Sequence, residues 1–184
     1  MTGARAKVLL RHIPGTISQI RQHGTAPLHE AVKQLSWLLG TWESETAKGF
    51  FPTIKPFEYK ETLEFTHVGQ PLLNFSFSSF TPDNVPKHRD SGFLRVNIGT
   101  NHVAFVSAQN VGIVEIEEGD VNGTELQLES NGILHSSFAS LPHTTKIART
   151  FKLIDESTLE QTVSMATTTT PELKPHLSVR YKKV

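Results

Sequence analysis

The chain has 184 residues, enough for one domain with a hydrophobic core. Its 18 Lys and Arg side chains balance 18 Asp and Glu side chains, so it lacks the basic excess typical of proteins that bind nucleic acids or membrane surfaces. It has no cysteine, which excludes disulfides, iron–sulfur clusters, thiolate zinc sites and a cysteine nucleophile. We expect a globular protein of a reducing compartment, without nucleic-acid or membrane partners.

The first 29 residues differ in composition from the rest. They carry Arg and Lys side chains and no acidic side chain before Glu30. We expect a flexible basic tail, or a short helix, over residues 1–29 and a single domain over residues 30–184. Basic, acid-free N-termini also occur in organelle transit peptides. The expected location is cytoplasmic, with a nuclear location and mitochondrial targeting by residues 1–29 left open.

A short helix is predicted at the start of the domain. Apolar residues recur with helical spacing between residues 28 and 39, namely Ala31, Val32, Leu35 and Leu38. Gly40 then has the character of a helix end. In Gly40-Thr41-Trp42 we expect a strand to start near Trp42, whose indole either fills one end of a barrel or is a core side chain beside a turn.

After Trp42 the pattern is that of β-strands. Apolar and polar residues alternate along Phe57–Phe65 and again along Leu73–Ser78, with a turn at Val68–Pro71 between them. Further β-rich segments follow at Gly92–Val96, His102–Ser107, Gly112–Ile116, Glu125–Leu128, Ile147–Leu153, Leu159–Met165 and Leu177–Tyr181. About ten short strands joined by hairpin turns predict an all-β antiparallel barrel, and alternation with one polar face predicts a shared interior with room for a small ligand.

Few residues stand out as candidates for catalysis or metal binding. No nucleotide-binding, hydrolase or HExxH metal motif is present. We expect Glu115 and Glu117, which share one face of a strand, to form a solvated surface rather than a catalytic pair. The nine histidines are scattered without zinc-site spacing, but haem requires only one axial histidine when a hydrophobic cavity holds the macrocycle.

His176 follows Pro175 at the start of the last predicted strand, on the face opposite to Leu177, Val179 and Tyr181. The alternation therefore does not select it as a ligand. A β-bulge or the preceding proline would be needed to turn its side chain inward.

Several segments, in this order, resemble the nitrobindin family, and in particular the C-terminal nitrobindin-like domain of animal THAP proteins. They are Leu35–Trp42 (LSWLLGTW), Pro52-Thr53-Ile54, His67–Phe77 (HVGQPLLNFSF), His88–Arg95 (HRDSGFLR), Val106–Gly119 (VSAQNVGIVEIEEG), Leu159–Thr169 (LEQTVSMATTT), His176-Leu177 and Tyr181–Val184 (YKKV). The resemblance covers most of the chain, from about Leu35 to Val184.

This resemblance implies a ten-stranded barrel, related in shape to fatty-acid-binding proteins and other calycins, that binds haem b. It implies His176 as the axial iron ligand, Thr53 at the haem site and His88 on the opposite, distal side of the haem. The family's activities are the binding of nitric oxide and the isomerisation of peroxynitrite to nitrate at a ferric haem. The chain is therefore expected to be a haem-dependent peroxynitrite isomerase with no catalytic group beyond the iron.

Two departures from the family pattern limit the resemblance. Its GxWxGxG signature has Ser44 and Thr46 in place of the second and third glycines, so the pocket edge is expected to differ. A THAP zinc module requires cysteine, which is absent, so DNA binding is not expected. The alternative function is that of a binding protein for a fatty acid or another hydrophobic molecule, without catalysis. A second alternative is an interaction module whose cavity is vestigial.

Overall fold

The computed structural model describes residues 26–184, so most of the expected tail over residues 1–29 lies outside the described part. The described residues form one 3-10 helix followed by eleven strands. These elements are η1 (Glu30–Leu38), β1 (Gly40–Phe51), β2 (Ile54–Glu58), β3 (Lys60–Thr66), β4 (Leu72–Phe80), β5 (Pro86–Val96), β6 (His102–Gln109), β7 (Ile113–Asn122), β8 (Glu125–His135), β9 (Thr144–Asp155), β10 (Thr158–Thr167) and β11 (Thr170–Lys183).

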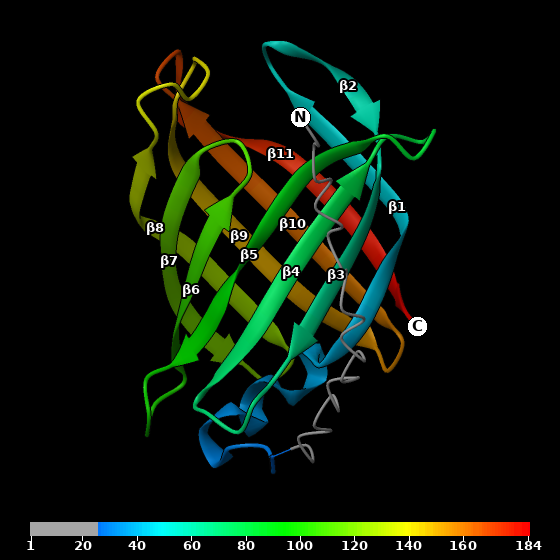
Figure 1. The fold of residues 1–184 in the computed structure, drawn as a ribbon, viewed down its shortest axis with the longest axis vertical. Coiled ribbons are helices and arrows are strands. Elements are labelled where there is room, and N and C mark those ends of the chain that lie inside the picture. Colours follow the sequence, from blue (N-terminus) through cyan, green and yellow to red (C-terminus); the bar gives the residue numbers. More distant parts are fainter. Residues whose placement is uncertain (1–25) are drawn as a thin grey trace, which may run out of the picture.

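Ten of these strands close into an antiparallel barrel (Figure 1). From β3 to β11 each strand pairs with the next one along the chain, and β1 closes the ring by pairing with both β3 and β11. Strand β2 pairs with β1 alone and stands outside the ring as the second arm of a hairpin. The prediction of a ten-stranded antiparallel barrel with a short N-terminal helix is confirmed.

One predicted strand is divided in two. The alternation along Phe57–Phe65 predicts a single strand, but the structure breaks it at Tyr59, between β2 and β3. The reason is that β1 meets this segment in two places, with its Gly40–Glu43 half on β3 and its later residues on β2. At the break, the backbone N–H of Tyr59 donates to the carbonyl of Ala47. The hairpin β1–β2 can therefore rise above the barrel rim.

Apolar side chains fill the end of the barrel that η1 closes. The alternation along β4 is reproduced in its burial, and the rings of Phe75 on β4 and Phe105 on β6 stack with centroids 4.1 Å apart. Trp42 is fully buried there, and its Nε1–H donates to the carbonyl of Leu38 at 2.7 Å. Each large apolar side chain buried in this way contributes about 1.5–3 kcal/mol to the stability of the folded state. The packed end fixes the barrel shape and leaves the opposite end for a cavity.

The glycine replacements at Ser44 and Thr46 fall at an irregularity of β1. The pairing of β1 with β11 shifts between these two residues, which leaves Glu45 as an extra residue. The hydroxyl of Ser44 accepts a hydrogen bond from the backbone N–H of Glu61 at 2.8 Å. Neither Ser44 nor Thr46 lines the cavity, and the expected difference at the pocket edge stays a prediction.

Candidate functional site

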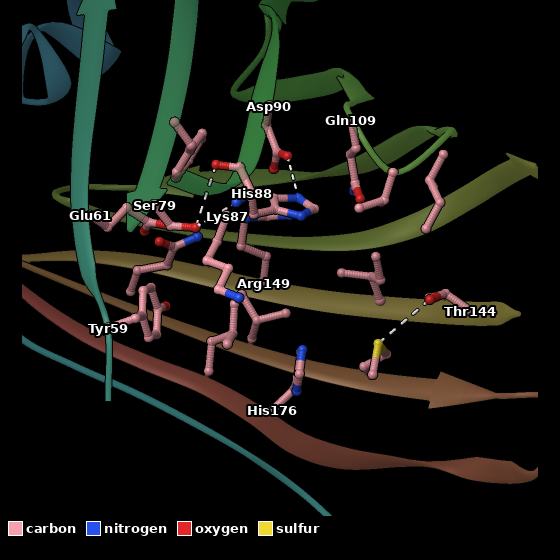
Figure 2. Close-up of a pocket in the computed structure, with 18 of the residues that line it drawn as sticks. Tyr59, Glu61, Ser79, Lys87, His88, Asp90, Gln109, Thr144, Arg149 and His176 are labelled. Atoms are coloured by element: carbon pink, nitrogen blue, oxygen red, sulfur yellow. Dashed lines mark hydrogen bonds and ion pairs between the residues drawn. The ribbon is translucent and has the colours of Figure 1, made fainter. Parts of the chain in front are cut away.

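A cavity of about 610 Å³ occupies the end of the barrel opposite η1. It lies within the size range of pockets that hold drug-sized or cofactor-sized molecules. Residues from both ends of the described domain line it, from Phe57 on β2 to His176 and Leu177 on β11. Its wall combines apolar side chains with a small set of ionisable ones (Figure 2). Such a wall suits a large apolar ligand that is oriented by a few polar contacts.

His176 reaches this cavity through a β-bulge. Along β11, Leu177 pairs with Val163 of β10 while Pro175 pairs with Ser164, so two neighbouring residues of β10 face three residues of β11. His176 is the unpaired residue between them. The bulge changes which face of the strand is inward, so that His176 and Leu177 both line the cavity. Of the two expected means of turning His176 inward, a bulge or the preceding proline, the pairing of β10 with β11 shows the bulge.

A single hydrogen bond fixes the tautomer of His176. Its Nδ1 lies 3.0 Å from the backbone carbonyl oxygen of Phe50 on β1. Because a carbonyl can only accept, Nδ1 carries the proton and donates, which leaves Nε2 with a free lone pair in the neutral ring. The ring also meets the edge of Phe51, with centroids 5.8 Å apart.

Burial lowers the pKa of His176 from its ordinary value, and this outweighs the opposing effect of the Phe50 carbonyl. Nearby His88 lowers this pKa further. The imidazole is therefore neutral at pH 7, the state in which histidine binds a metal ion. Donation of the other ring N–H to a backbone carbonyl is the usual support for a histidine that ligates a metal.

His88 lies on β5, on the wall of the cavity across from His176 (Figure 2). Its Nε2 is 2.5 Å from Oδ1 of Asp90, two residues along the same strand and on the same face. Asp90 is only 8% exposed, so its carboxylate is screened little by water. The structure thus brings together two of the three predicted site residues, His88 and His176.

Thr53 lies elsewhere. It occupies the turn between β1 and β2, where Phe51 pairs with Ile54, and its side chain is exposed. It does not line the cavity, although its hairpin starts from Phe50 and Phe51, which both contact His176. The place of Thr53 at a haem site remains a prediction.

The prediction that Glu115 and Glu117 form a solvated face is wrong. Both are fully buried, whereas Val114 and Ile116, which alternate with them along β7, are 47% and 41% exposed. The inverted pattern is explained by Arg149 of β9, which donates from Nε to Glu117 at 3.1 Å and from Nη2 to Glu115 at 3.3 Å. A buried carboxylate is tolerated when a guanidinium satisfies it.

This ion-pair cluster separates the cavity from the packed end of the barrel. The guanidinium of Arg149 lies over the ring of Phe105, 4.7 Å from its centroid, and the other side of Arg149 lines the cavity. Burial raises the pKa of Glu115 to about 7, with Arg149 opposing and Glu117 adding to the shift. We call Glu61, Asp90, Glu115, Glu117 and Arg149 the cavity floor.

Glu61 is the second carboxyl of the cavity floor whose pKa is raised to about 7. It is 8% exposed, and its Oε1 accepts a hydrogen bond from the hydroxyl of Tyr181 at 2.5 Å. The same hydroxyl lies 2.6 Å from Oε1 of Gln161. Burial raises the pKa of Glu61 to about 7, although the Tyr181 hydrogen bond opposes this shift. The floor therefore holds exchangeable protons at physiological pH.

Sequence reasoning did not identify the floor residues as part of the site. Two of them stand between apolar or aromatic neighbours on an inward face: Glu61 lies between Tyr59 and Leu63, and Arg149 between Ile147 and Phe151. Ionisable side chains at apolar positions of the alternation were the available signal. An acid and a base in such positions indicate a shared buried cluster rather than independent surface groups.

In residues 26–184 no three His, Cys, Asp or Glu side chains group together in a way that could hold a metal ion. His135 and His143 stack with centroids 4.4 Å apart, but beside a separate cavity of about 390 Å³. No helix in the described part of the chain is long and apolar enough to cross a membrane. His176 is thus a candidate for a metal that requires one protein ligand.

Residues 31–183 match the model of the THAP4-like, heme-binding beta-barrel domain. The rat protein named peroxynitrite isomerase THAP4 (Rattus norvegicus) is 55% identical over 164 residues, which cover 88% of this chain and 29% of the rat protein. The human protein of the same name is 55% identical over 159 residues, covering 85% of this chain and 27% of the human protein. The chain therefore spans less than a third of the length of these two relatives.

Two further relatives match over nearly their whole length. An Arabidopsis thaliana protein named peroxynitrite isomerase is 32% identical over 170 residues, covering 91% of this chain and 98% of that protein. The crystal structure of Rv2717c from M. tuberculosis superposes with a TM-score of 0.76 at 33% identity, covering 85% of this chain and 99% of that one. The barrel described above is thus the fold of a solved relative.

Proposed function

This chain belongs to the THAP4-like heme-binding β-barrel (nitrobindin) family, and we propose that it binds haem b through His176 and isomerises peroxynitrite to nitrate. The relatives named peroxynitrite isomerase support the reaction, and the family model supports the cofactor. The assignments of His176 and His88 are supported by their positions on the cavity wall.

The observation that carries the proposal is the state of the His176 ring. Its Nδ1–H is bound to the Phe50 carbonyl, its pKa is lowered, and it lines a cavity of about 610 Å³. A neutral imidazole with Nε2 free, held over a largely apolar cavity, fits the donor that haem iron requires. The bulge at His176 favours the same role, because bulges often serve to re-aim a functional side chain.

The side chains of the cavity have separate roles in this proposal. His176 would hold the iron, and His88 would face a small ligand on the opposite side of the cavity. Thr53 would approach the haem from the β1–β2 hairpin. When bound, the haem supplies the iron chemistry that converts peroxynitrite to nitrate. The protein contributes a fixed axial donor, an apolar wall that limits water, and a polar partner for the anion.

The cavity floor argues against the alternative function, the binding of a fatty acid. A buried carboxylate requires an unpaired cation or several donors. Arg149 is the guanidinium of the floor, and Glu115 and Glu117 already occupy it. A fatty-acid headgroup at this depth would meet Glu61 and Asp90 as well. A ligand that leaves its carboxylates at the cavity mouth avoids this repulsion.

Reconstitution with haemin tests the proposed function. Loaded protein should speed the decay of peroxynitrite and protect free tyrosine from nitration, whereas haem-free protein should do neither. The His176→Ala variant mixed with the same amount of haemin serves as the control for loosely associated haem. Unchanged peroxynitrite decay and tyrosine nitration with fully loaded wild-type protein would refute the isomerase activity.

The proposed location is the cytoplasm. A chain of 184 residues without cysteine suits a reducing compartment. Fractionation of cells followed by detection of the endogenous protein tests this. Recovery in the mitochondrial or nuclear fraction instead would favour one of the two alternative locations.

A further inference from the structure

His88 and Asp90 form a fixed pair on the cavity wall opposite His176 (Figure 2). Strand β5 places the two side chains on its inward face, two residues apart, with Nε2 of His88 at 2.5 Å from Oδ1 of Asp90. The Asp90 side chain is 8% exposed, whereas the His88 side chain is 37% exposed and lines the cavity. The carboxylate therefore lies behind the imidazole, away from the solvent.

The backbone holds both residues of the pair in place. The N–H of His88 donates to the hydroxyl of Ser79 on β4 at 3.0 Å, and Ser79 is itself buried. Asp90 pairs with Phe77 of β4 on one side and with Gln109 of β6 on the other. A His–Asp pair on paired, central strands has little freedom to separate.

We propose that Asp90 is a positioning residue for the proposed reaction, which holds His88 as an imidazolium facing the side of the haem opposite His176. The inference rests on the proposed function. A protonated imidazole has two N–H donors, and the one at Nε2 lies beside the Asp90 carboxylate, whose Oδ1 has no hydrogen-bond partner among the described residues. The N–H at Nδ1 is left for an oxygen of a small anion in the cavity. A neutral ring with Nε2–H bound to Asp90 would offer that anion only a lone pair.

The charges around His88 favour its protonated form. Burial lowers its pKa, but the contact with Asp90 and the charges of Asp90 and Glu61 raise it, and Arg149 opposes them. The net shift is upward from the ordinary value. The titratable or charged groups that share the cavity with His88 are Glu58, Tyr59, Glu61, Lys87, Asp90, Arg149 and His176. Among these, Asp90 is the one in direct contact.

The first test measures the titration of His88 by NMR of the ring nitrogens in haem-free protein. Wild-type His88 should titrate above its ordinary value, and Asp90→Asn should lower this pKa by about one unit or more. Asp120→Asn is the matched control, because Asp120 pairs with His102 at 2.8 Å on the barrel surface and should leave His88 unchanged. A wild-type His88 that titrates below its ordinary value would overturn the proposal without any variant.

The second test measures azide and fluoride affinity of haem-loaded protein across pH 5–9. Asp90→Asn should weaken anion binding by about tenfold at the upper end of this range, where the pH lies well above the pKa in both proteins, as one pKa unit implies, and Asp90→Glu should restore part of it. Equal affinity in wild type and Asp90→Asn would overturn the positioning role. If haem fails to bind, the proposed function fails, but the NMR test still decides whether Asp90 controls the protonation of His88.

Discussion

His176 and Phe50 are joined by a 3.0 Å hydrogen bond between the imidazole Nδ1 and a backbone carbonyl. The bond links the bulge of β11 to the β1 residue that begins the β1–β2 hairpin, 126 positions earlier in the chain. It determines which ring nitrogen faces the cavity. The ligand role of His176 therefore depends on how β1 is held as well as on the histidine itself.

The packing of Phe51 against His176 should affect haem binding. Phe51 is 6% exposed and meets the imidazole edge-on. Phe51→Leu should loosen the ring and weaken haem affinity by about tenfold, the lower end of what loss of a supporting partner costs a metal ligand. Haemin titration followed by absorbance measures this. Phe93→Leu on the outer face, where Phe93 is 47% exposed, should leave haem affinity unchanged; an equal loss in both variants would contradict the prediction.

Arg149 should be essential for stability. Arg149→Met leaves Glu115 and Glu117 buried without a cation and should lower the free energy of unfolding by about 3–5 kcal/mol. Urea unfolding at pH 8 measures the loss. Arg180→Met is the control, because Arg180 is 45% exposed and pairs with Glu160 at the surface, so it should cost less than about 1 kcal/mol. Similar losses in the two variants would show that the floor is not a buried ion-pair cluster.

Glu61 should make stability fall as the pH rises. Its pKa is raised to about 7 in the folded protein, so between its ordinary value near 4.5 and about 7 the folded state binds more protons than the unfolded state. Stability therefore decreases through this window. Glu61→Gln should raise the melting temperature at pH 8 by a few degrees, about what 1 kcal/mol gives in a domain of this size, and by less at pH 4.5. If Glu61→Gln changed the melting temperature by the same amount at both pH values, the raised pKa of Glu61 would be contradicted.

The floor should also reject fatty acids. Wild-type protein should not bind a fluorescent stearate analogue with its carboxylate at the cavity floor, because the floor cation, Arg149, is already paired with Glu115 and Glu117. Glu115→Gln/Glu117→Gln would release Arg149 from both carboxylates and should create measurable binding. Micromolar affinity in the wild type, with no gain in the double variant, would instead favour the alternative function as a fatty-acid carrier.

The barrel was predictable from the sequence because alternation and hairpin turns are local properties. Along β4, buried Leu73, Phe75 and Phe77 follow the pattern directly. The division at Tyr59 was not predictable, since it depends on how β1 pairs with two segments at once.

The site was only partly predictable, because its chemistry comes from contacts between distant strands. Glu115 and Glu117 have the sequence pattern of a solvated strand face, and the arginine that neutralises them, Arg149, lies more than thirty positions away in the chain. His176 is on the wrong face by alternation, and only the register of β10 with β11 reveals the bulge. The resemblance supplied His176 and His88, whereas Asp90 and Glu61 emerged from the fold.

The most direct test of His176 as the haem ligand is haemin titration of wild type, His176→Gly and His102→Ala, each with and without added imidazole. We predict a Soret band typical of histidine-ligated ferric haem in the wild type and in His102→Ala. In His176→Gly we predict affinity weakened by more than about tenfold, with the spectrum restored by imidazole in solution. The same spectrum and affinity in His176→Gly as in the wild type, without imidazole, would contradict the assignment of His176 as the haem ligand.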